Sequence, residues 1–146
     1  MIALGSDHAG FDYKERFKKL LGEIGKPYQD FGTFSPDSVD YPDIAHMVSN
    51  AVASGKFQRG ILICGTGIGM SIVANKHNGI RAAACESSAS AKLSREHNDA
   101  NILCLGARIT NLETAMEIVK TFLATPFSGE ERHICRIQKI HSLTGL

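Results

Sequence analysis

The residues best suited to chemistry lie at a glycine-rich turn near the middle of the chain. A short apolar run, 61–64, ends in Cys64, and Gly-Thr-Gly-Ile-Gly follows at 65–69. At the start of a helix, free main-chain N–H groups and the helix dipole attract negative charge, which favours a thiolate over a thiol. The pattern therefore predicts a reactive Cys64 and a turn whose N–H groups bind an anion or a developing oxyanion.

Other glycine-rich sites can be compared with this turn. A dinucleotide site has the spacing G-x-G-x-x-G, but position 70 is Met, although Glu86 lies at the distance expected of a ribose-binding acid. A P-loop needs Gly-Lys followed by Ser or Thr, and that pattern is absent. A cysteine phosphatase needs an arginine to cradle the phosphate, where this chain again has Met70. An anion-binding turn and a tight turn without a ligand remain as interpretations.

Polar side chains also follow the other predicted strands. Ligands of an open parallel sheet bind beyond the carboxyl ends of its strands. We therefore expect these side chains, and those that end the helix before the fifth strand, to share one edge of the sheet with Cys64. The set comprises Asp7, His8, Glu86, Arg95, His97, Asn98, Asp99 and Arg108.

Short apolar runs alternate with helical periods, and these elements must position the candidates. The apolar runs are residues 2–6, 28–31, 60–64, 80–84 and 102–105. They lack a polar face, which is typical of strands buried on both sides. Helical spacing of apolar residues recurs within 17–24, 44–52 and 112–123, the last preceded by Asn111 as a possible N-cap. The alternation predicts an α/β protein with a five-stranded parallel sheet between helices, in a single domain over residues 1–146.

A final helix over about residues 130–142 carries two arginines on one face. Arg132 and Arg136 are four residues apart, a spacing at which two guanidinium groups can grip a phosphate. A solvated basic face is the alternative. Isoleucines at 134, 137 and 140 line another face, which predicts that the helix docks by its apolar side. We expect the segment 129–146 to pack on a partner subunit.

Composition and charge restrict the partners. The chain has 146 residues, 43% hydrophobic and 21% charged, and its 16 Lys and Arg against 15 Asp and Glu give a net charge of +1. Nucleic acid and anionic membranes attract more basic surfaces, so we expect neither as a partner. No apolar run approaches the roughly 20 residues that cross a bilayer, and the first residues do not resemble a signal peptide. The spacing of the four cysteines suits neither disulfides nor zinc, which favours a cytoplasmic protein without a metal.

Seven segments resemble, in chain order, the B-type ribose-5-phosphate isomerases. They are SDHAG at 6–10, DYPD at 40–43, ILICGTGIGMSI at 61–72, ANK at 74–76, GIRAA at 79–83, LSREHNDANIL at 93–103 and RHICR at 132–136. The wider group includes galactose-6-phosphate and allose-6-phosphate isomerases. The resemblance implies a Rossmann-like three-layer α/β/α sandwich, a homodimer or dimer of dimers, and active sites between subunits. It also implies interconversion of D-ribose 5-phosphate and D-ribulose 5-phosphate through an enediolate, with neither metal nor cofactor.

The resemblance also implies roles for individual residues. Cys64 matches the family's catalytic base, His97 the acid that opens the furanose ring, and Thr66 a residue that assists proton transfer near the ring oxygen. One branch of the family uses a glutamate at the position of Met70, which this chain lacks. Positions matching substrate-binding residues, with the last two as the phosphate clamp, are Asp7, His8, Gly65, Thr66, Gly67, Ile68, Gly69, Asn98, Arg108, Arg132 and Arg136.

Three other functions stay open. The enzyme could isomerise a six-carbon sugar phosphate, such as allose or galactose 6-phosphate, with segments 32–42 and 75–79 setting substrate length. It could be a cysteine hydrolase or phosphatase that uses Cys64 as a nucleophile, and a trapped covalent intermediate would identify it. A non-enzymatic module that binds a phosphorylated metabolite at residues 65–69 is the third possibility.

Overall fold

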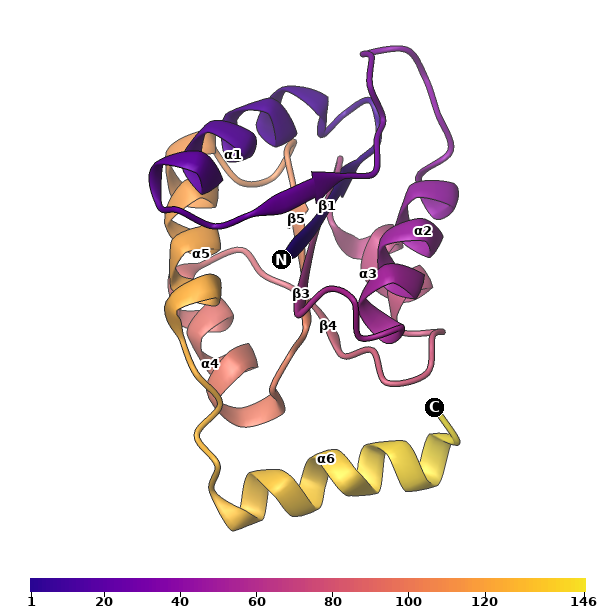
Figure 1. Cartoon of the computed structure of the whole chain (residues 1–146), viewed down its shortest axis with the longest axis vertical. Helices are drawn as coiled ribbons and strands as arrows, with labels where there is room; N and C mark the ends of the chain where they lie inside the picture. Colours follow the sequence, from indigo (N-terminus) through magenta and orange to yellow (C-terminus); the bar gives the residue numbers. More distant parts are fainter.

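The computed structural model describes residues 1–146 and shows one parallel sheet with the strand order β2-β1-β3-β5-β4 (Figure 1). The strands are β1 (Ile2–Ser6), β2 (Tyr28–Asp30), β3 (Arg59–Cys64), β4 (Ala82–Ala84) and β5 (Ile102–Gly106). The predicted α/β class with a five-stranded parallel sheet is confirmed. The clearest difference is β4, which begins two residues later than predicted because the N–H of Arg81 donates to the side chain of Asn101.

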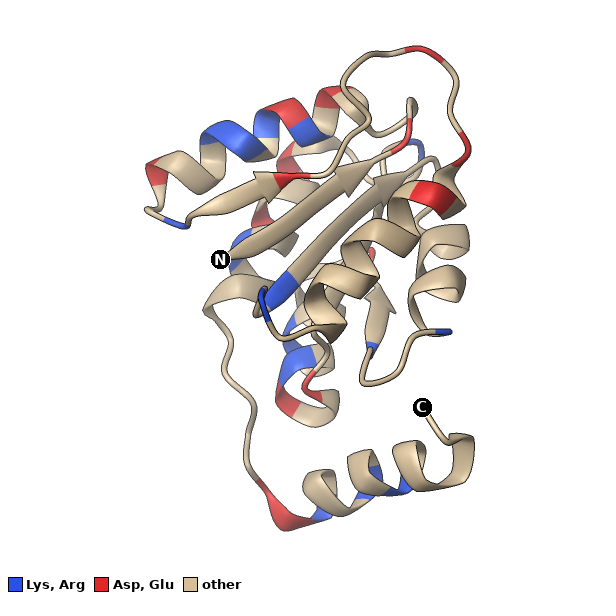
Figure 2. Ribbon diagram, turned by 45° about the vertical axis from the view of Figure 1, so that its right-hand side comes forward, with Lys and Arg blue, Asp and Glu red and all other residues tan.

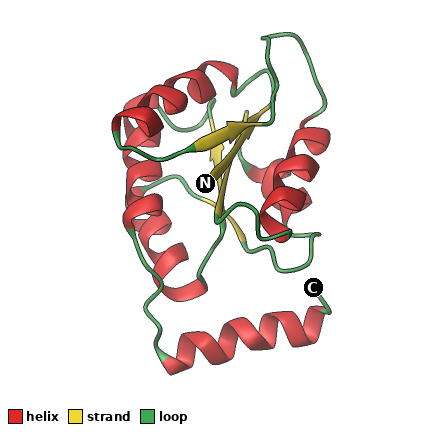
Figure 3. Ribbon diagram, viewed as in Figure 1, coloured by secondary structure: helices red, strands yellow, loops and turns green.

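Helices cover both faces of the sheet, as in a Rossmann-like sandwich (Figures 1 and 3). Helices α1 (Phe11–Glu23), α4 (Ser88–Asn98) and α5 (Leu112–Ala124) lie on one face, and α2 (Tyr41–Ala53) and α3 (Ile68–Ala74) on the other. The chain ends in α6 (Glu131–Thr144). Asn111 caps α5 as predicted, since its side chain accepts a hydrogen bond from the N–H of Thr114 at 2.9 Å.

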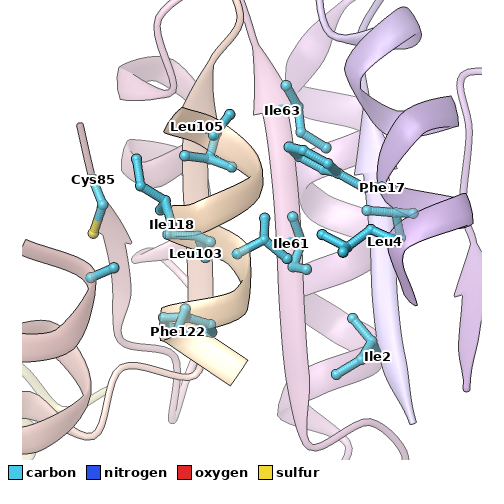
Figure 4. Close-up of a cluster of buried hydrophobic side chains, with 14 of the residues drawn as sticks. Ile2, Leu4, Phe17, Ile61, Ile63, Cys85, Leu103, Leu105, Ile118 and Phe122 are labelled. Atoms are coloured by element: carbon cyan, nitrogen blue, oxygen red, sulfur yellow. The ribbon is translucent and has the colours of Figure 1, made fainter. Parts of the chain in front are cut away.

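The three central strands, β1, β3 and β5, are buried on both faces, which holds them in fixed positions. Figure 4 shows Ile61 and Ile63 of β3 close to Phe17 of α1 on the side that α1, α4 and α5 cover. On the other side, Leu62 and Cys64 join a second cluster with Val48 of α2. Burying one large aliphatic side chain contributes about 1.5–3 kcal/mol. The loops at the ends of these strands therefore start from well-fixed positions.

Helix α6 lies apart from the two helical layers, beyond the amino-terminal ends of the strands. In Figure 2 the strand arrows point away from it. Ile134 and Ile140 are 39% and 43% exposed, so the apolar side of α6 does not dock on its own chain, and its packing on a partner subunit stays a prediction. The apolar side is instead available to another molecule. No helix of the chain is both long enough and apolar enough to span a bilayer.

Candidate active site

Cys64 and Asp7 leave the sheet side by side at its topological switch point. From β1 the chain passes to β2 on one side, and β3 pairs with β1 on the other, with Ser6 opposite Ile63. The N–H of Asp7 donates to the carbonyl of Ile63 at 3.1 Å. Open parallel sheets bind ligands in the crevice at this point. The prediction that Asp7 shares an edge with Cys64 is therefore confirmed.

Cys64 is only 4% exposed, and its sulfur lies within the glycine-rich turn. The N–H of Gly67 donates to Sγ at 3.1 Å, which stabilises negative charge on the sulfur. Gly67 has φ 77°, and a Cβ there would lie 2.9 Å from the main-chain carbon of Leu105. Only glycine suits both the conformation and the close approach. The turn is thus pinned against β5 with its N–H directed at the thiol.

The side chains of Thr66 and Arg108 flank the same turn. Thr66 Oγ1 accepts a hydrogen bond from the N–H of Ile68 at 3.2 Å. The main-chain N–H of Arg108 donates to the carbonyl of Gly65 at 3.0 Å. The guanidinium of Arg108 lies close over Gly65, since a Cβ added to this glycine would be 3.3 Å from Nη1. A hydroxyl and a cation therefore flank the turn that follows Cys64, and their roles toward a substrate stay predictions.

Tyr41 is a residue of this edge that the sequence reasoning did not single out. It begins α2, and its ring covers Gly69 so closely that a Cβ on Gly69 would be 2.6 Å from Cζ of the ring. The φ of Gly69 is not positive, so a side chain at this position would be opposed by the ring of Tyr41 and not by the backbone conformation. The available signal was the DYPD segment at 40–43.

Asp7 and His8 are held in defined orientations. Asp7 is 6% exposed, and its Oδ1 accepts the N–H of Gly10 at 3.1 Å. The Nδ1 of His8 accepts the N–H of Val39 at 3.3 Å, so the neutral ring carries its proton on Nε2. Val39 belongs to the long loop at the carboxyl end of the sheet (Figure 3).

A buried lysine anchors that loop. The Nζ of Lys14 is fully buried and lies 2.6 Å from both Asp30 Oδ1 and the carbonyl oxygen of Thr33. Buried charges are stable only when paired and hydrogen-bonded, as here. The pair holds the start of the loop against β1 and so supports the contact between Val39 and His8.

The prediction that His97 and Asn98 lie on the same edge as Cys64 is wrong within one chain. They end α4, which runs back from the carboxyl end of β4 to the amino end of β5. Eleven helical residues span about 16 Å. Arg95 and Asp99 lie at this opposite edge too. Glu86 does follow the carboxyl end of β4, but β5 separates β4 from β3.

His97 instead meets the C-terminal helix. Its ring lies against that of His133, with the ring centroids 4.4 Å apart and the planes tilted by 35°. His133 is buried, and its Nδ1 is 2.8 Å from the hydroxyl of Ser128. Desolvation lowers the pKa of His133, and the neighbouring His97 and Arg132 lower it further. His133 thus stays neutral at neutral pH, and nothing but its place within RHICR marked it in the sequence.

Arg132 and Arg136 are exposed on α6 at the same end of the molecule. Both contribute to the positive surroundings of His133, and the Nε of Arg132 donates to Glu130 Oε2 at 2.8 Å. The chain therefore carries two groups of candidate residues at opposite edges of the sheet. We name them the cysteine half-site, comprising Asp7, His8, Cys64–Gly69 and Arg108, and the histidine half-site, comprising His97, Asn98, Arg132 and Arg136.

The other cysteines differ from Cys64. All four are unpaired, and Cys135 is exposed on α6. Burial raises the pKa of Cys85 and raises that of Cys104 well above its ordinary value. Both therefore remain neutral thiols. No cluster of three or more His, Cys, Asp or Glu side chains is arranged to hold a metal ion.

Comparisons with known proteins agree on one kind of enzyme. A family profile described as Ribose/Galactose Isomerase matches residues 2–140. Ribose-5-phosphate isomerase B of Escherichia coli is 46% identical over 142 residues, 97% of this chain and 95% of the relative. D-erythrulose-4-phosphate isomerase of Pectobacterium atrosepticum is 45% identical over 130 residues, covering 88% of this chain and 85% of that enzyme. The structure of ribose-5-phosphate isomerase B from Clostridium thermocellum has a TM-score of 0.96, 50% identity, and coverage of 99% and 97%.

Proposed function

This chain belongs to the ribose/galactose isomerase family, and we propose that it interconverts D-ribose 5-phosphate and D-ribulose 5-phosphate. Family membership makes the enzyme an isomerase rather than a hydrolase or a binding module. One observation carries the proposal: the sulfur of Cys64 lies at the switch point of the sheet with the N–H of Gly67 directed at it. A base within a cradle of N–H groups suits the removal of a proton next to a carbonyl.

The reaction can be written with these residues. The Cys64 thiolate removes the proton from C2 of the open-chain aldose, and the electron pair moves to O1 to give an enediolate. The N–H groups of Gly67 and Ile68 already bond to Sγ and to Thr66 Oγ1, so the other N–H groups of the turn and the cation of Arg108 stabilise the charge on the oxygens. The proton on O2 passes to O1, and the proton held by Cys64 then returns to C1 as C2 becomes the carbonyl. Ribose 5-phosphate must first open its ring, and His97 donates a proton to the ring oxygen while Thr66 assists.

One step of this scheme can be observed apart from ring opening. Ribulose 5-phosphate is acyclic, because its C5 hydroxyl is phosphorylated. Exchange of its C1 proton with deuterium from the solvent needs the base and the enediolate but no ring-opening acid. The ratio of C1 exchange to net conversion therefore reports on the acid separately from the base.

Because the half-sites lie at opposite edges of one chain, we propose that the active site forms between two copies. The cysteine half-site of one copy would meet the histidine half-site of the other, with twofold symmetry making two equal sites. Exposed apolar side chains accompany both halves. Ile68 and Ile72 of α3 are 53% and 58% exposed beside the glycine-rich turn. A cavity of about 400 Å³, partly lined by Ile80 and Ile140, lies next to Asn98. Association would cover both surfaces.

In this arrangement Arg132 and Arg136 bind the phosphate of the substrate, while Cys64 acts at the other end. Remote phosphate binding supplies energy for orienting the reacting carbons. The distance between clamp and base would then set the preferred chain length. The names of the relatives include four-carbon and five-carbon sugar phosphates, and ribose 5-phosphate is the more frequent among them. A six-carbon phosphate, such as allose or galactose 6-phosphate, is the second candidate.

A substrate panel tests the proposal. Purified enzyme is assayed with EDTA on ribose 5-phosphate, erythrulose 4-phosphate, allose 6-phosphate and galactose 6-phosphate, and kcat/KM is compared. We expect the highest value for ribose 5-phosphate. A higher value for another sugar phosphate would move the assignment to that substrate, and no turnover of any of the four would reject it. Cys104→Ala serves as a control for loss of a thiol, because burial keeps that residue neutral.

A further inference from the structure

Arg81 connects the two helices that carry the histidine half-site. It lies just before β4, and its guanidinium uses all three nitrogens. Nε donates to the carbonyl of Asn98 at 2.8 Å, and Nη2 donates to the carbonyl of Asp99 at 2.9 Å. Nη1 donates to the Nε2 of His141 on α6 at 2.9 Å. One planar group thus bridges the end of α4 and the end of α6.

The end of α4 has an unfavourable backbone conformation, which these hydrogen bonds stabilise. Asp99 follows the helix with φ 45°, the only residue other than glycine with a positive φ. Its carboxylate is held from two sides, by Arg81 at 3.2 Å and by the buried Arg95 at 2.7 Å. A cation at the carboxyl end of a helix is also stabilised by the helix dipole. Together these contacts fix the turn that immediately follows His97 and Asn98.

The contact between Arg81 and His141 fixes the end of α6. The Nε2 of His141 accepts from Arg81, so its Nδ1 carries the proton and donates to the carbonyl oxygen of Leu146. Leu146 is therefore part of the same network. His133 provides the second point at which α6 meets α4, through its contact with His97. These two attachment points fix α6, with Arg136 between them and Arg132 next to His133.

We propose that Arg81 is a positioning residue that holds His97 and Asn98 in fixed relation to Arg132 and Arg136. The proposal rests on the proposed function, because it assigns these four residues to one substrate. Arg81 touches no reacting atom. Its role follows from a fork geometry that a lysine, with a single point charge, does not reproduce.

The test is Arg81→Gln, with Arg59→Gln as the matched control. Arg59 begins β3, at the same edge of the sheet but separated from β4 by β5, and its side chain donates a hydrogen bond only to the carbonyl of Gln58. In Arg81→Gln we expect kcat/KM for ribose 5-phosphate to fall about tenfold to a hundredfold, as loss of hydrogen bonds to a charged group implies. KM should rise, and the ratio of C1 exchange to conversion should rise as it does when the acid is impaired. Arg81→Lys should resemble Arg81→Gln more than the wild type.

Three further results decide between a positioning role, a purely structural role and failure of the proposed function. An Arg81→Gln enzyme with wild-type kcat, KM and exchange ratio, even at a lower melting temperature, would show that Arg81 serves stability alone. If Arg81→Gln does not fold, His141→Leu decides: a several-fold rise in KM with an unchanged exchange ratio supports the proposal, and an unchanged KM overturns it. Wild-type turnover is measured alongside. Its absence would reject the proposed function itself, whereas failure confined to the variants rejects only the role of Arg81.

Discussion

The two half-sites are positioned by different means. The cysteine half-site is held by main-chain contacts: the N–H of Gly67 on the sulfur, the carbonyl of Gly65 under Arg108, and a glycine pressed against β5. The histidine half-site is held by side chains, with His97 against His133 and Arg81 between two helices.

This difference matches what each half does in the proposed reaction. The base and the N–H cradle must fit a transition state closely, and loops rooted in a buried parallel sheet give that precision. The acid and the phosphate clamp lie on helix ends near exposed apolar surface, where they can meet the cysteine half-site of another copy. One chain thus carries a rigidly held cysteine half-site and a histidine half-site that lies near surface suited to association with another copy.

The largest effect is expected from Cys64→Ala, which removes the base from the rigid half. Conversion of ribose 5-phosphate and C1 exchange of ribulose 5-phosphate should both fall by about 10²–10⁴-fold, the contribution of a positioned general base. Substrate affinity, measured by calorimetry, should stay nearly unchanged. Cys104→Ala should retain activity. Wild-type-like turnover in Cys64→Ala would remove this residue from the base role.

His97→Ala should impair conversion with a different signature. We expect net conversion to fall by about a hundredfold, since ring opening loses its acid. Exchange at C1 of ribulose 5-phosphate, followed by NMR in D₂O, should fall much less. Equal losses of exchange and conversion would mean that His97 acts on the enediolate rather than on the ring.

Arg132→Ala and Arg136→Ala should each weaken binding more than chemistry. KM for ribose 5-phosphate should rise by about tenfold to a hundredfold as one charged phosphate contact is lost. Lys139→Ala, on the same helix, is the control. An unchanged KM in both arginine variants would show that they form only a solvated surface.

The smallest effect concerns the stability of the histidine half-site. The pKa of His133 is lowered in the folded chain from its ordinary value of 6.5, so the unfolded chain binds this proton more tightly. Its contribution to stability is fully present above pH 6.5 and is lost as the pH falls below that value. Urea unfolding at about pH 7.5 and about pH 5.5 should show a larger loss for the wild type than for His133→Asn. Equal losses would assign the pH dependence to other groups.

The positions of the residues in the cysteine half-site could be predicted from the sequence because the carboxyl ends of parallel strands lie at one edge of the sheet. Each buried strand could be recognised from its apolar run, and the residues after β1, β3 and β5 then had to lie together. The glycines at 67 and 69 also revealed a tight turn. Tyr41 was not singled out, because its contact with Gly69 depends on how α2 packs on α3.

The placement of His97 failed for a physical reason that topology explains. A helix between parallel strands runs back along the sheet, so residues at its end lie at the amino edge rather than the carboxyl edge. The contacts of Arg81 with His141 and of His97 with His133 join residues far apart in the sequence. No local spacing encodes such pairs, and only the packed structure reveals them.

A mixed dimer tests most directly whether one active site needs both half-sites from different chains. Cys64→Ala and His97→Ala chains carrying different tags are produced together, and the mixed dimer is isolated by sequential affinity steps. One of its two sites is then intact, so we predict about half of the wild-type turnover per dimer, while each parent variant is nearly inactive. A mixed dimer as inactive as both parents would contradict a site shared between two chains.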